Sequence, residues 1–407
     1  MIESLTIIGA GEAGTQAALH LRERGWDGEI VLIGQEPHTP YERPPLSNAV
    51  LTEGISPPLL SSAEQLQKLQ IRFLQGSQVA EIDRQSHRLR LQNDESLPYD
   101  KLLLATGASA RRLTCSGSEH ALVLRNLDEA LAFRSLLVPG KHLILIGAGF
   151  IGLELAASAR KLDCKVTVLE MAPRILGRAV PPEVAETIAS EQKRQGVEIR
   201  CDVQLDQIKA LKSGYTIELK NGESISSDLV VAGIGAVPEV ALAEAAGLDI
   251  ENGISVNVFL QTSYPHIYAV GDCCSFPHPL YDQQRMRLGM WRCARDQAKC
   301  AMQNLLGETK KFSAVPSFWS DQFELSLQVA GLPSFAKIVI PRTRPDGVTI
   351  YFGLNDQEQL VSAAGIGAGS SVAKDIRLAK MLIAAQKTVT PAELSDPNLN
   401  LKKLFKS

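Results

Sequence analysis

The chain has 407 residues, of which 45% are hydrophobic and 21% are charged, and its formal net charge is -3. This length is too great for one hydrophobic core and fits two or three domains of ordinary size. The composition is that of a globular protein, and neither its charge balance nor its hydropathy indicates bulk nucleic-acid binding.

The start of the chain and its cysteines favour a cytoplasmic protein. The first residues lack the basic and apolar regions of a secretory signal, and no stretch approaches the roughly 18 uninterrupted apolar residues that span a bilayer. Seven cysteines are scattered without CxxC spacing, so we expect reduced structural thiols. Seven histidines show no ligand spacing, and we expect no metal site.

The first predicted unit lies at the N-terminus. Residues 5–8 are apolar, residues 9–14 read Gly-Ala-Gly-Glu-Ala-Gly, a helical pattern runs to Gly25, and residues 29–33 are apolar again. This order predicts a strand, a glycine turn, a helix and a second strand.

The glycines of this first loop have separate tasks in dinucleotide binding. Gly9 permits the tight turn, Gly11 lets the backbone approach a diphosphate, and Gly14 lets the helix pack against the strand. The helix N-terminus, which includes Ala13, faces the phosphates. Glu36 follows the second strand, where a ribose-binding carboxylate is expected.

A second copy of this unit follows at residues 142–170. Its turn contains Gly147, Gly149 and Gly152. The third glycines of the two copies are 138 residues apart (152 minus 14), and the closing carboxylates are 134 apart (170 minus 36). One glycine turn can occur without a ligand, but a duplicated unit predicts two dinucleotide sites.

Glu170 at the end of the second copy favours NADH over NADPH. A carboxylate there accepts a hydrogen bond from a free ribose hydroxyl and repels a 2′-phosphate. Arg174 and Arg178 follow closely and could serve such a phosphate, but arginines after a strand are more often solvated. We therefore expect NADH at the second site.

The last part of the chain predicts a different architecture. Residues 325–330 and 348–352 alternate as antiparallel strands, and residues 372–386 read as an amphipathic helix. This pattern predicts an α+β domain.

Four further motifs complete the sequence pattern. They are the segments Pro40-Tyr41-Glu42-Arg43-Pro44-Pro45-Leu46-Ser47, Leu102-Leu103-Leu104-Ala105-Thr106-Gly107, Ile267-Tyr268-Ala269-Val270-Gly271-Asp272 and Phe318-Trp319-Ser320-Asp321-Gln322. Together with the glycine loops, they resemble the two-dinucleotide flavoprotein reductases. The closer resemblance is to ferredoxin reductases of Rieske-type (aromatic-ring) dioxygenase systems and to putidaredoxin and rubredoxin reductases, and it covers essentially the whole chain.

This resemblance implies the fold, the cofactors and the reaction. It implies an α/β fold with two Rossmann-like domains of the glutathione-reductase type and a C-terminal α+β domain. The expected domains are an FAD-binding domain (1–111 and 243–315), an NAD-binding domain (112–242) and a C-terminal reductase domain (316–407). The implied reaction is hydride transfer from NADH to FAD, followed by single-electron transfer to a [2Fe-2S] ferredoxin that feeds an oxygenase.

The resemblance also implies the site residues. Those expected to bind FAD are Gly9, Gly11, Ala13, Gly14, Glu36, Arg43, Asn48, Val79, Thr106, Gly107, Arg125, Gly271, Asp272 and Trp291. Those expected to bind NAD are Gly147, Gly149, Gly152, Glu154, Glu170 and Gly235. The expected catalytic residues are Asn48, Glu154 and Trp319, with Trp319 near the isoalloxazine. Simpler interpretations make Val79 a core residue, Arg125 an ion-pair partner and the tryptophans packing residues.

Three positions depart from the family pattern. Asn48 stands where relatives have a lysine beside the flavin, Gly289 replaces a glutamate, and Cys293 replaces an asparagine. That lysine pairs with the glutamate matching Glu154, so we expect Glu154 to keep its charge without this partner and to disfavour a reduced flavin anion. Alternatively, the joint loss of both charges at residues 48 and 289 is compensated and leaves the reaction intact.

The segment at residues 44–49 separates this chain from thiol-dependent relatives. The disulfide reductases and NADH peroxidases of the wider superfamily have a cysteine on the helix after the first unit, whereas this segment contains none. A flavin without a thiol can still take a hydride and release single electrons. The alternatives are a rubredoxin reductase, an NADH oxidase, or a weakly catalytic flavoprotein that senses NADH or binds a partner.

A basic helical face is the predicted partner site. Arg292, Arg295 and Lys299 fall at i, i+3 and i+7 and share one face, where an acidic ferredoxin could dock. Basic helical faces are more often simply solvated.

Overall fold

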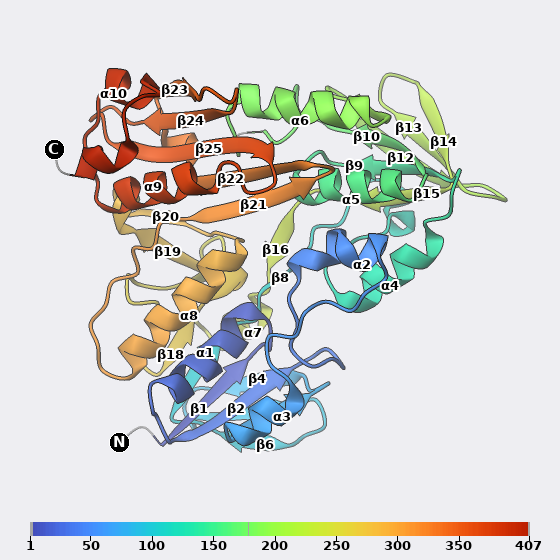
Figure 1. The fold of residues 1–407 in the computed structure, drawn as a ribbon. Helices are drawn as coiled ribbons and strands as arrows, with labels where there is room; N and C mark the ends of the chain where they lie inside the picture. The colour runs from blue at the N-terminus through green and yellow to red at the C-terminus, as the bar shows by residue number, and fades with distance from the viewer. Residues whose placement is uncertain (1–2, 178, 406–407) are drawn as a thin grey trace. The chain divides into compact units, whose positions relative to one another are not determined.

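The computed structural model describes residues 3–177 and 179–405, which fold into two compact units (Figure 1). The first unit comprises residues 3–42, 58–109 and 237–316, and the remainder forms the second. Residues 43–57, expected in the first domain, group with the second unit because α2 (Ala49–Thr52) packs on α4 (Leu127–Leu136) and α5 (Phe150–Lys161). The finer division into three domains remains a prediction.

A five-stranded parallel sheet forms the centre of the first unit. Its strand order is β18-β7-β1-β2-β3, and the inner strands β7, β1 and β2 are buried after their first residue, as expected for a parallel sheet with both faces covered. The strands of this sheet and the main helices of the unit are β1 (Ser4–Ile8), α1 (Glu12–Glu23), β2 (Glu29–Gly34), α3 (Ala63–Lys68), β3 (Ile71–Gln75), β7 (Lys101–Leu104), α7 (Ala241–Ala245), β18 (Ile267–Ala269) and α8 (Trp291–Leu305).

Short strands that the sequence did not predict complete this unit. They form two three-stranded sheets, β4-β5-β6 and β17-β19-β20. Their bounds are β4 (Val79–Asp83), β5 (Arg88–Leu91), β6 (Ser96–Pro98), β17 (Ile254–Ser255), β19 (Cys274–His278) and β20 (Gln284–Met286). The chain passes between the units within β8 (Ala108–Ala110) and β16 (Ala236–Pro238).

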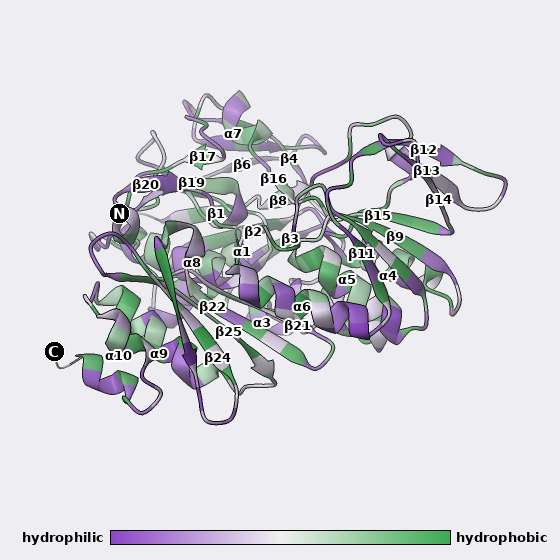
Figure 2. Ribbon diagram, turned by 90° about the horizontal axis from the view of Figure 1, so that it is seen from above, coloured by the Kyte–Doolittle hydropathy of each residue, from purple (hydrophilic) through white to green (hydrophobic). Residues whose placement is uncertain are grey.

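The second unit contains the repeat of this parallel arrangement. Its four-stranded sheet has the order β11-β10-β9-β15, and Figure 2 draws β9 and β15 in green, as expected for strands buried on both faces. A three-stranded antiparallel sheet, β12-β13-β14, joins it. The elements are β9 (His142–Ile146), β10 (Lys165–Leu169), α6 (Pro182–Arg194), β11 (Val197–Arg200), β12 (Leu205–Ala210), β13 (Tyr215–Leu219), β14 (Ser224–Ser227) and β15 (Leu229–Ala232).

The same unit ends in a five-stranded antiparallel sheet of order β21-β22-β25-β24-β23, along which α9 lies (Figure 1). The predicted strands appear as β22 and β24, and the predicted helix is α9, shorter by a few terminal residues. The bounds are β21 (Ser317–Gln322), β22 (Leu325–Gly331), β23 (Ile338–Thr343), β24 (Thr349–Leu354), β25 (Leu360–Ala368), α9 (Ala373–Ala384) and α10 (Pro391–Ser395). The predicted fold class, two Rossmann-like α/β regions and a C-terminal α+β region, is confirmed.

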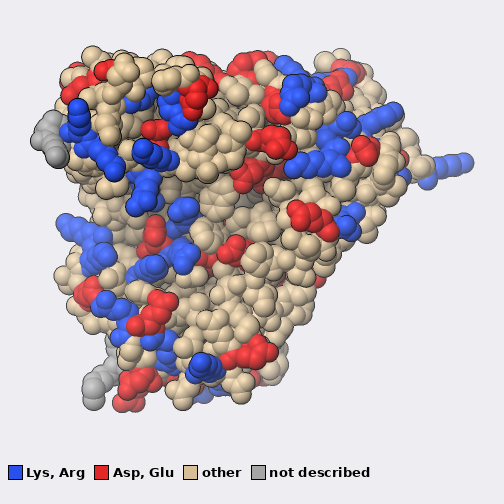
Figure 3. Space-filling model, in the orientation of Figure 1, with Lys and Arg blue, Asp and Glu red and all other residues tan. Residues whose placement is uncertain are grey.

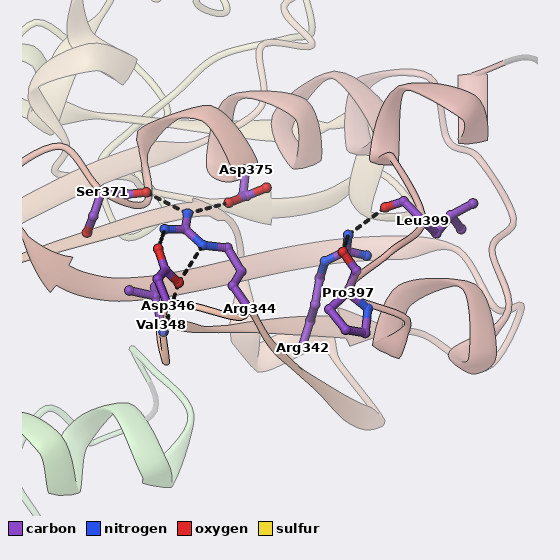
Figure 4. A network of polar contacts seen from close by, with 8 residues as sticks. All are labelled: Arg342, Arg344, Asp346, Val348, Ser371, Asp375, Pro397 and Leu399. Carbon is purple, nitrogen blue, oxygen red and sulfur yellow. Dashed lines mark hydrogen bonds and ion pairs between the residues drawn. The ribbon is translucent and has the colours of Figure 1, made fainter.

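Two arginines of this C-terminal region hold its connections in place (Figure 4). Arg344 forms ion pairs with Asp346 and Asp375 and donates to the Ser371 carbonyl. Arg342 is 5% exposed and donates to the carbonyl oxygens of Leu394, Pro397 and Leu399. The guanidinium of Arg342 thereby fixes the irregular segment after α10 to strand β23.

Candidate active site: two glycine loops and a clamped glutamate

The first glycine loop has a shape that excludes side chains at two positions and leaves space at a third. A Cβ on Gly9, whose φ is +111°, would lie 2.1 Å from the Ala105 oxygen, and a Cβ on Gly14 would lie 1.9 Å from the Gly9 oxygen. A Cβ on Gly11 would meet nothing within 4 Å. The open side at Gly11, before the N-terminus of α1, fits the approach of a diphosphate.

The second loop repeats this geometry on the parallel sheet of the other unit. A Cβ on Gly147, with φ +102°, would lie 2.6 Å from the Gly233 oxygen, and one on Gly152 would lie 2.2 Å from the Gly147 oxygen. On Gly149 the nearest atom would be 3.9 Å away. The duplication inferred from sequence therefore extends to the tight contacts and to the open position of each loop.

The two closing carboxylates have different surroundings. Glu36 accepts a hydrogen bond from the Tyr41 hydroxyl. Glu170 accepts from the backbone N–H groups of Ala148, at 2.7 Å, and Ala172, at 2.8 Å, so it fixes the second glycine loop as well as closing the strand. Arg174 donates to the Val180 carbonyl at 3.3 Å, and Arg178 lies outside the described residues.

Gly271 lies between the N-terminal ends of α1 and α8. A Cβ there would be 3.2 Å from the Ala13 Cβ and 3.8 Å from the Ala294 Cβ, and the Gly271 N–H donates to Gln297 at 2.7 Å. The next residue, Asp272, is close to Gly289, where a Cβ would lie 3.8 Å from the carboxyl carbon. The glutamate that the resemblance implies at position 289 would bring a second acid next to Asp272, whereas Gly289 contributes no side chain there.

Glu12 is a residue of this site that the sequence reasoning missed. It is the first residue of α1, and both carboxyl oxygens are shielded from solvent. Burial raises its pKa to about 7; Glu42 adds to this effect, whereas Arg295 and Trp291 oppose it. The Arg295 guanidinium lies 5.6 Å from the centroid of the Trp291 ring. Glu12 could have been noticed as the only ionisable residue within the first glycine loop.

The other predicted FAD ligands are divided between the units. In the first, Val79 opens β4 and is 7% exposed, and Thr106, next to Gly107, donates from its hydroxyl to the Glu239 carbonyl at 2.7 Å. In the second, Arg43 donates to the Arg125 carbonyl at 2.6 Å. The structure therefore brings Arg43 and Arg125 together, although 82 residues separate them in sequence.

Glu154 on α5 has two hydroxyl partners. Ser47 donates to Oε2 and Ser320 donates to Oε1, each at 2.6 Å. Burial raises the pKa of Glu154, while the hydrogen bonds from Ser320 and Ser47 lower it. Glu154 therefore has serine hydroxyls on both oxygens in place of the lysine partner that is expected at residue 48, and the charge of Glu154 stays a prediction.

Two of the three predicted catalytic residues, Asn48 and Trp319, directly adjoin the serines that donate to Glu154. Asn48 follows Ser47 at the turn between η1 (Pro44–Ser47) and α2, where its carbonyl accepts from Leu51 and Thr52. Trp319 precedes Ser320 on β21 and therefore lies on the opposite face of that strand. Gly235, predicted at the NAD site, has φ +103° and open space at its Cβ position.

Neighbouring cysteines occur once in the sequence, at positions 273 and 274. Cys273 and Cys274 are fully buried, and burial raises the pKa of both thiols. In the described chain, His, Cys, Asp and Glu side chains do not gather into a group of three or more that could hold a metal ion. Within residues 3–177 and 179–405, no helix combines the length and apolar character needed to cross a membrane.

Two parallel sheets, each with a glycine loop of the same geometry, define an oxidoreductase that binds two dinucleotides. Residues 3–298 match the family model described as pyridine nucleotide-disulphide oxidoreductase, and residues 317–405 match the one described as reductase C-terminal. The chain belongs to the pyridine nucleotide-disulphide oxidoreductase family. Its cofactors are FAD and NADH, and the open positions at Gly11 and Gly149 fit their diphosphates.

Curated relatives span nearly the whole chain. This chain is 36% identical to a ferredoxin–NAD(+) reductase component of an anthranilate 1,2-dioxygenase system from Burkholderia cepacia, over 98% of both chains. It is 34% identical to putidaredoxin reductase from Pseudomonas putida, over 99% of this chain and 97% of that one. The resemblance inferred from the motifs is confirmed.

Solved structures agree with these relatives. A ferredoxin reductase from Rhodopseudomonas palustris has a TM-score of 0.93 at 35% identity, covering 98% of this chain and 99% of the other. A covalent putidaredoxin reductase–putidaredoxin complex gives 0.92 at 32% identity, covering 99% of this chain and 98% of that one. A water-forming NADH oxidase from Lactobacillus brevis, at 20% identity and a TM-score of 0.87, shares the fold alone.

Proposed function

We propose that this protein is an NADH-dependent ferredoxin reductase that supplies a [2Fe-2S] ferredoxin of an aromatic-ring dioxygenase system. The observation that supports this most directly is the pair of matching glycine loops combined with a thiol-free segment at residues 44–52. Relatives named as reductase components of dioxygenase systems support the same proposal.

The chemistry follows from the cofactors. Bound FAD supplies an acceptor for a hydride and a donor of single electrons. In the complete reaction one NADH reduces two oxidised ferredoxins, which yields NAD⁺, two reduced ferredoxins and one proton. The chain contributes binding and electrostatics: the loops at Gly11 and Gly149 would hold the diphosphates, Glu36 and Glu170 would hold the riboses, and Asp272 would hold the ribityl chain.

An acceptor assay tests this function. The purified protein, loaded with FAD, is mixed with NADH and either a [2Fe-2S] ferredoxin, a rubredoxin or oxygen alone. We expect fast NADH-dependent reduction of the ferredoxin, with NADPH much slower because of Glu170. Preferred reduction of rubredoxin or oxygen would replace the proposed acceptor. Slow flavin reduction by NADH with every acceptor would favour a sensing or partner-binding flavoprotein.

We further propose α8 as the ferredoxin-docking surface. Arg292 is exposed and Lys299 is half-buried on α8, and Figure 3 shows Lys and Arg side chains gathered over the region where Figure 1 draws this helix, with acidic side chains among them. Arg295 stacks on Trp291, so its charge also belongs to the flavin site. A basic face of this kind would steer an acidic partner.

Charge reversal tests the docking surface. Arg292→Glu and Lys299→Glu should each lower kcat/KM for ferredoxin several-fold at low salt, with a smaller effect at high salt, because screening weakens steering. Reduction of ferricyanide, a small acceptor, should be unchanged. The matched control is Lys212→Glu, an exposed lysine in the turn between β12 and β13. An equal loss in the control would contradict a docking role for α8. A cytoplasmic location, where NADH is available, is part of the same proposal.

A further inference from the structure

Helix α5 presents one stripe of side chains to two segments that are distant in sequence. Phe150, Glu154 and Ser158 recur every four residues and so share a face of the helix. Ser158 donates to the carbonyl of Ser47 at 2.7 Å, while the Ser47 hydroxyl donates back to Glu154. These two hydrogen bonds fix η1 to the helix that follows the NAD-binding loop.

Strand β21 meets the same stripe with alternate residues. Phe318 packs on Phe150 with ring centroids 4.8 Å apart, and Ser320, two residues on, reaches Glu154. Because side chains alternate across a strand, Gln322 lies on this face as well. The motif at residues 318–322 is therefore shaped to fit α5.

The buried side-chain amides of Gln192 and Gln322 form a hydrogen-bonded chain that ends at the Ser320 hydroxyl. Gln322 donates from Nε2 to the Ser320 hydroxyl oxygen at 3.2 Å, and Gln192 of α6 donates to Gln322 at 2.9 Å and to the Leu153 carbonyl at 3.0 Å. Gln192, Ser320 and Gln322 are each at most 3% exposed. Since the Ser320 oxygen accepts from Gln322, its single proton is directed toward Glu154.

We propose that Ser47 and Ser320 are positioning residues that hold the Glu154 carboxylate, with one hydroxyl on each oxygen, and that this carboxylate stabilises the positive charge that develops on nicotinamide when NADH gives up its hydride. This inference rests on the proposed function. The reacting dihydronicotinamide is neutral and becomes a cation, so a fixed carboxylate favours the product side of this step. The serine pair thus replaces the lysine partner that the sequence lacks at Asn48.

The sign of the pH dependence follows from the hydrogen bonds. An ionised carboxylate accepts from both serines, whereas a protonated one gives up one of these bonds, so both serines favour ionisation. Of the charged groups in the described part of the chain, Asp321 on β21 acts on Glu154 and opposes ionisation. Hydride transfer should therefore speed up as pH rises and Glu154 loses its proton.

The experiment is stopped-flow reduction of the FAD-loaded protein by NADH across pH. The wild type should show one ionisation that increases the rate with pH. Ser47→Ala and Ser320→Ala should each move this ionisation to higher pH. At a fixed pH within the range where the rate rises, flavin reduction should therefore be about tenfold slower than in the wild type. Asp321→Asn should move it to lower pH, and Glu154→Gln should remove it.

Controls separate this role from a structural one. Ser320→Thr keeps a hydroxyl and should restore the wild-type profile, and Ser317→Ala, on the same strand but bonded to Lys380, should not move it. An infrared spectrum of the protein without NADH gives a second readout, because the band of a neutral carboxyl at low pH should disappear in Glu154→Gln. The inference would be overturned if the rate of the serine variants rose at the same pH as that of the wild type. It would also be overturned if the rate still showed this ionisation in Glu154→Gln. A wild type that NADH does not reduce would instead overturn the proposed function.

Discussion

We predict that FAD binds more tightly when the Glu12 carboxyl is protonated. The FAD diphosphate is expected at the N-terminus of α1, where Glu12 is the first residue and where burial raises its pKa to about 7. Two unit charges ~6 Å apart repel by about 3 kcal/mol at an effective dielectric constant of 20. Because about 1.4 kcal/mol corresponds to a factor of ten, the ionised carboxylate should bind FAD more than tenfold less tightly than the neutral acid.

The size of the effect follows from the pKa of about 7. About nine-tenths of the molecules have a neutral Glu12 at pH 6, and about one-tenth at pH 8, so FAD should bind about tenfold more weakly at pH 8 than at pH 6. Glu12→Gln should bind equally at both pH values, at the strength of the neutral wild type. The raised pKa also means that the FAD-free wild type loses stability as pH rises from 4.5 to about 7, and that the glutamine variant does not.

The assay is titration of FAD-free protein with FAD, followed by the loss of flavin fluorescence between pH 6 and pH 8.5. Glu42→Gln is the matched control, because it removes a neighbouring charge that raises the pKa of Glu12 and should shift the dependence to lower pH. An affinity for FAD that falls equally with pH in wild type and Glu12→Gln would refute the reasoning.

Three other substitutions have expected outcomes. In Gly152→Ala the new Cβ would lie 2.2 Å from the Gly147 oxygen, so the backbone of the loop must shift. This shift should weaken NADH binding about a hundredfold while the flavin absorbance stays normal. Normal NADH binding would contradict the loop geometry. Glu170→Gln keeps an oxygen for the Ala148 and Ala172 N–H groups but removes the charge, so the kcat/KM preference for NADH over NADPH should fall at least about tenfold; an unchanged preference would exclude Glu170 as its source. Arg342→Met should cost about 2–4 kcal/mol in unfolding free energy, with faster hydrogen exchange first in residues 391–405, because three carbonyls lose their donor; exchange that speeds up elsewhere first would argue against this local role.

The long elements could be predicted because their signals are local. The strands before Gly9 and Gly147 are apolar on both faces and end in glycines, so the sequence alone indicates strand, turn and helix. Helix α9 was predicted slightly too long at both ends, and the ends of strands β22 and β24 were predicted to within two residues. Strand β17 has only two residues and strand β20 only three, which is too few for a periodic signal in the sequence.

The surroundings of Glu154 could not be predicted because they depend on contacts between distant segments. Ser47 and Ser320 lie within the motifs that indicated the family, yet they are 273 residues apart (320 minus 47), and a motif does not show where a hydroxyl points. The sequence reasoning chose Asn48 and Trp319, each a direct neighbour of the residue that contacts the carboxyl. The raised pKa of Glu12 was missed for a similar reason, since its burial depends on α8 packing against α1.

The buried amides of Gln192 and Gln322 limit how this chain can be shortened. Deleting the sequence after residue 316 would take away Ser320 and Gln322, expose the inner side of α6, and leave one Glu154 oxygen without its donor. The C-terminal region is thus no detachable module: a truncated protein would retain both glycine loops but would have lost half of the hydrogen bonding that orients Glu154.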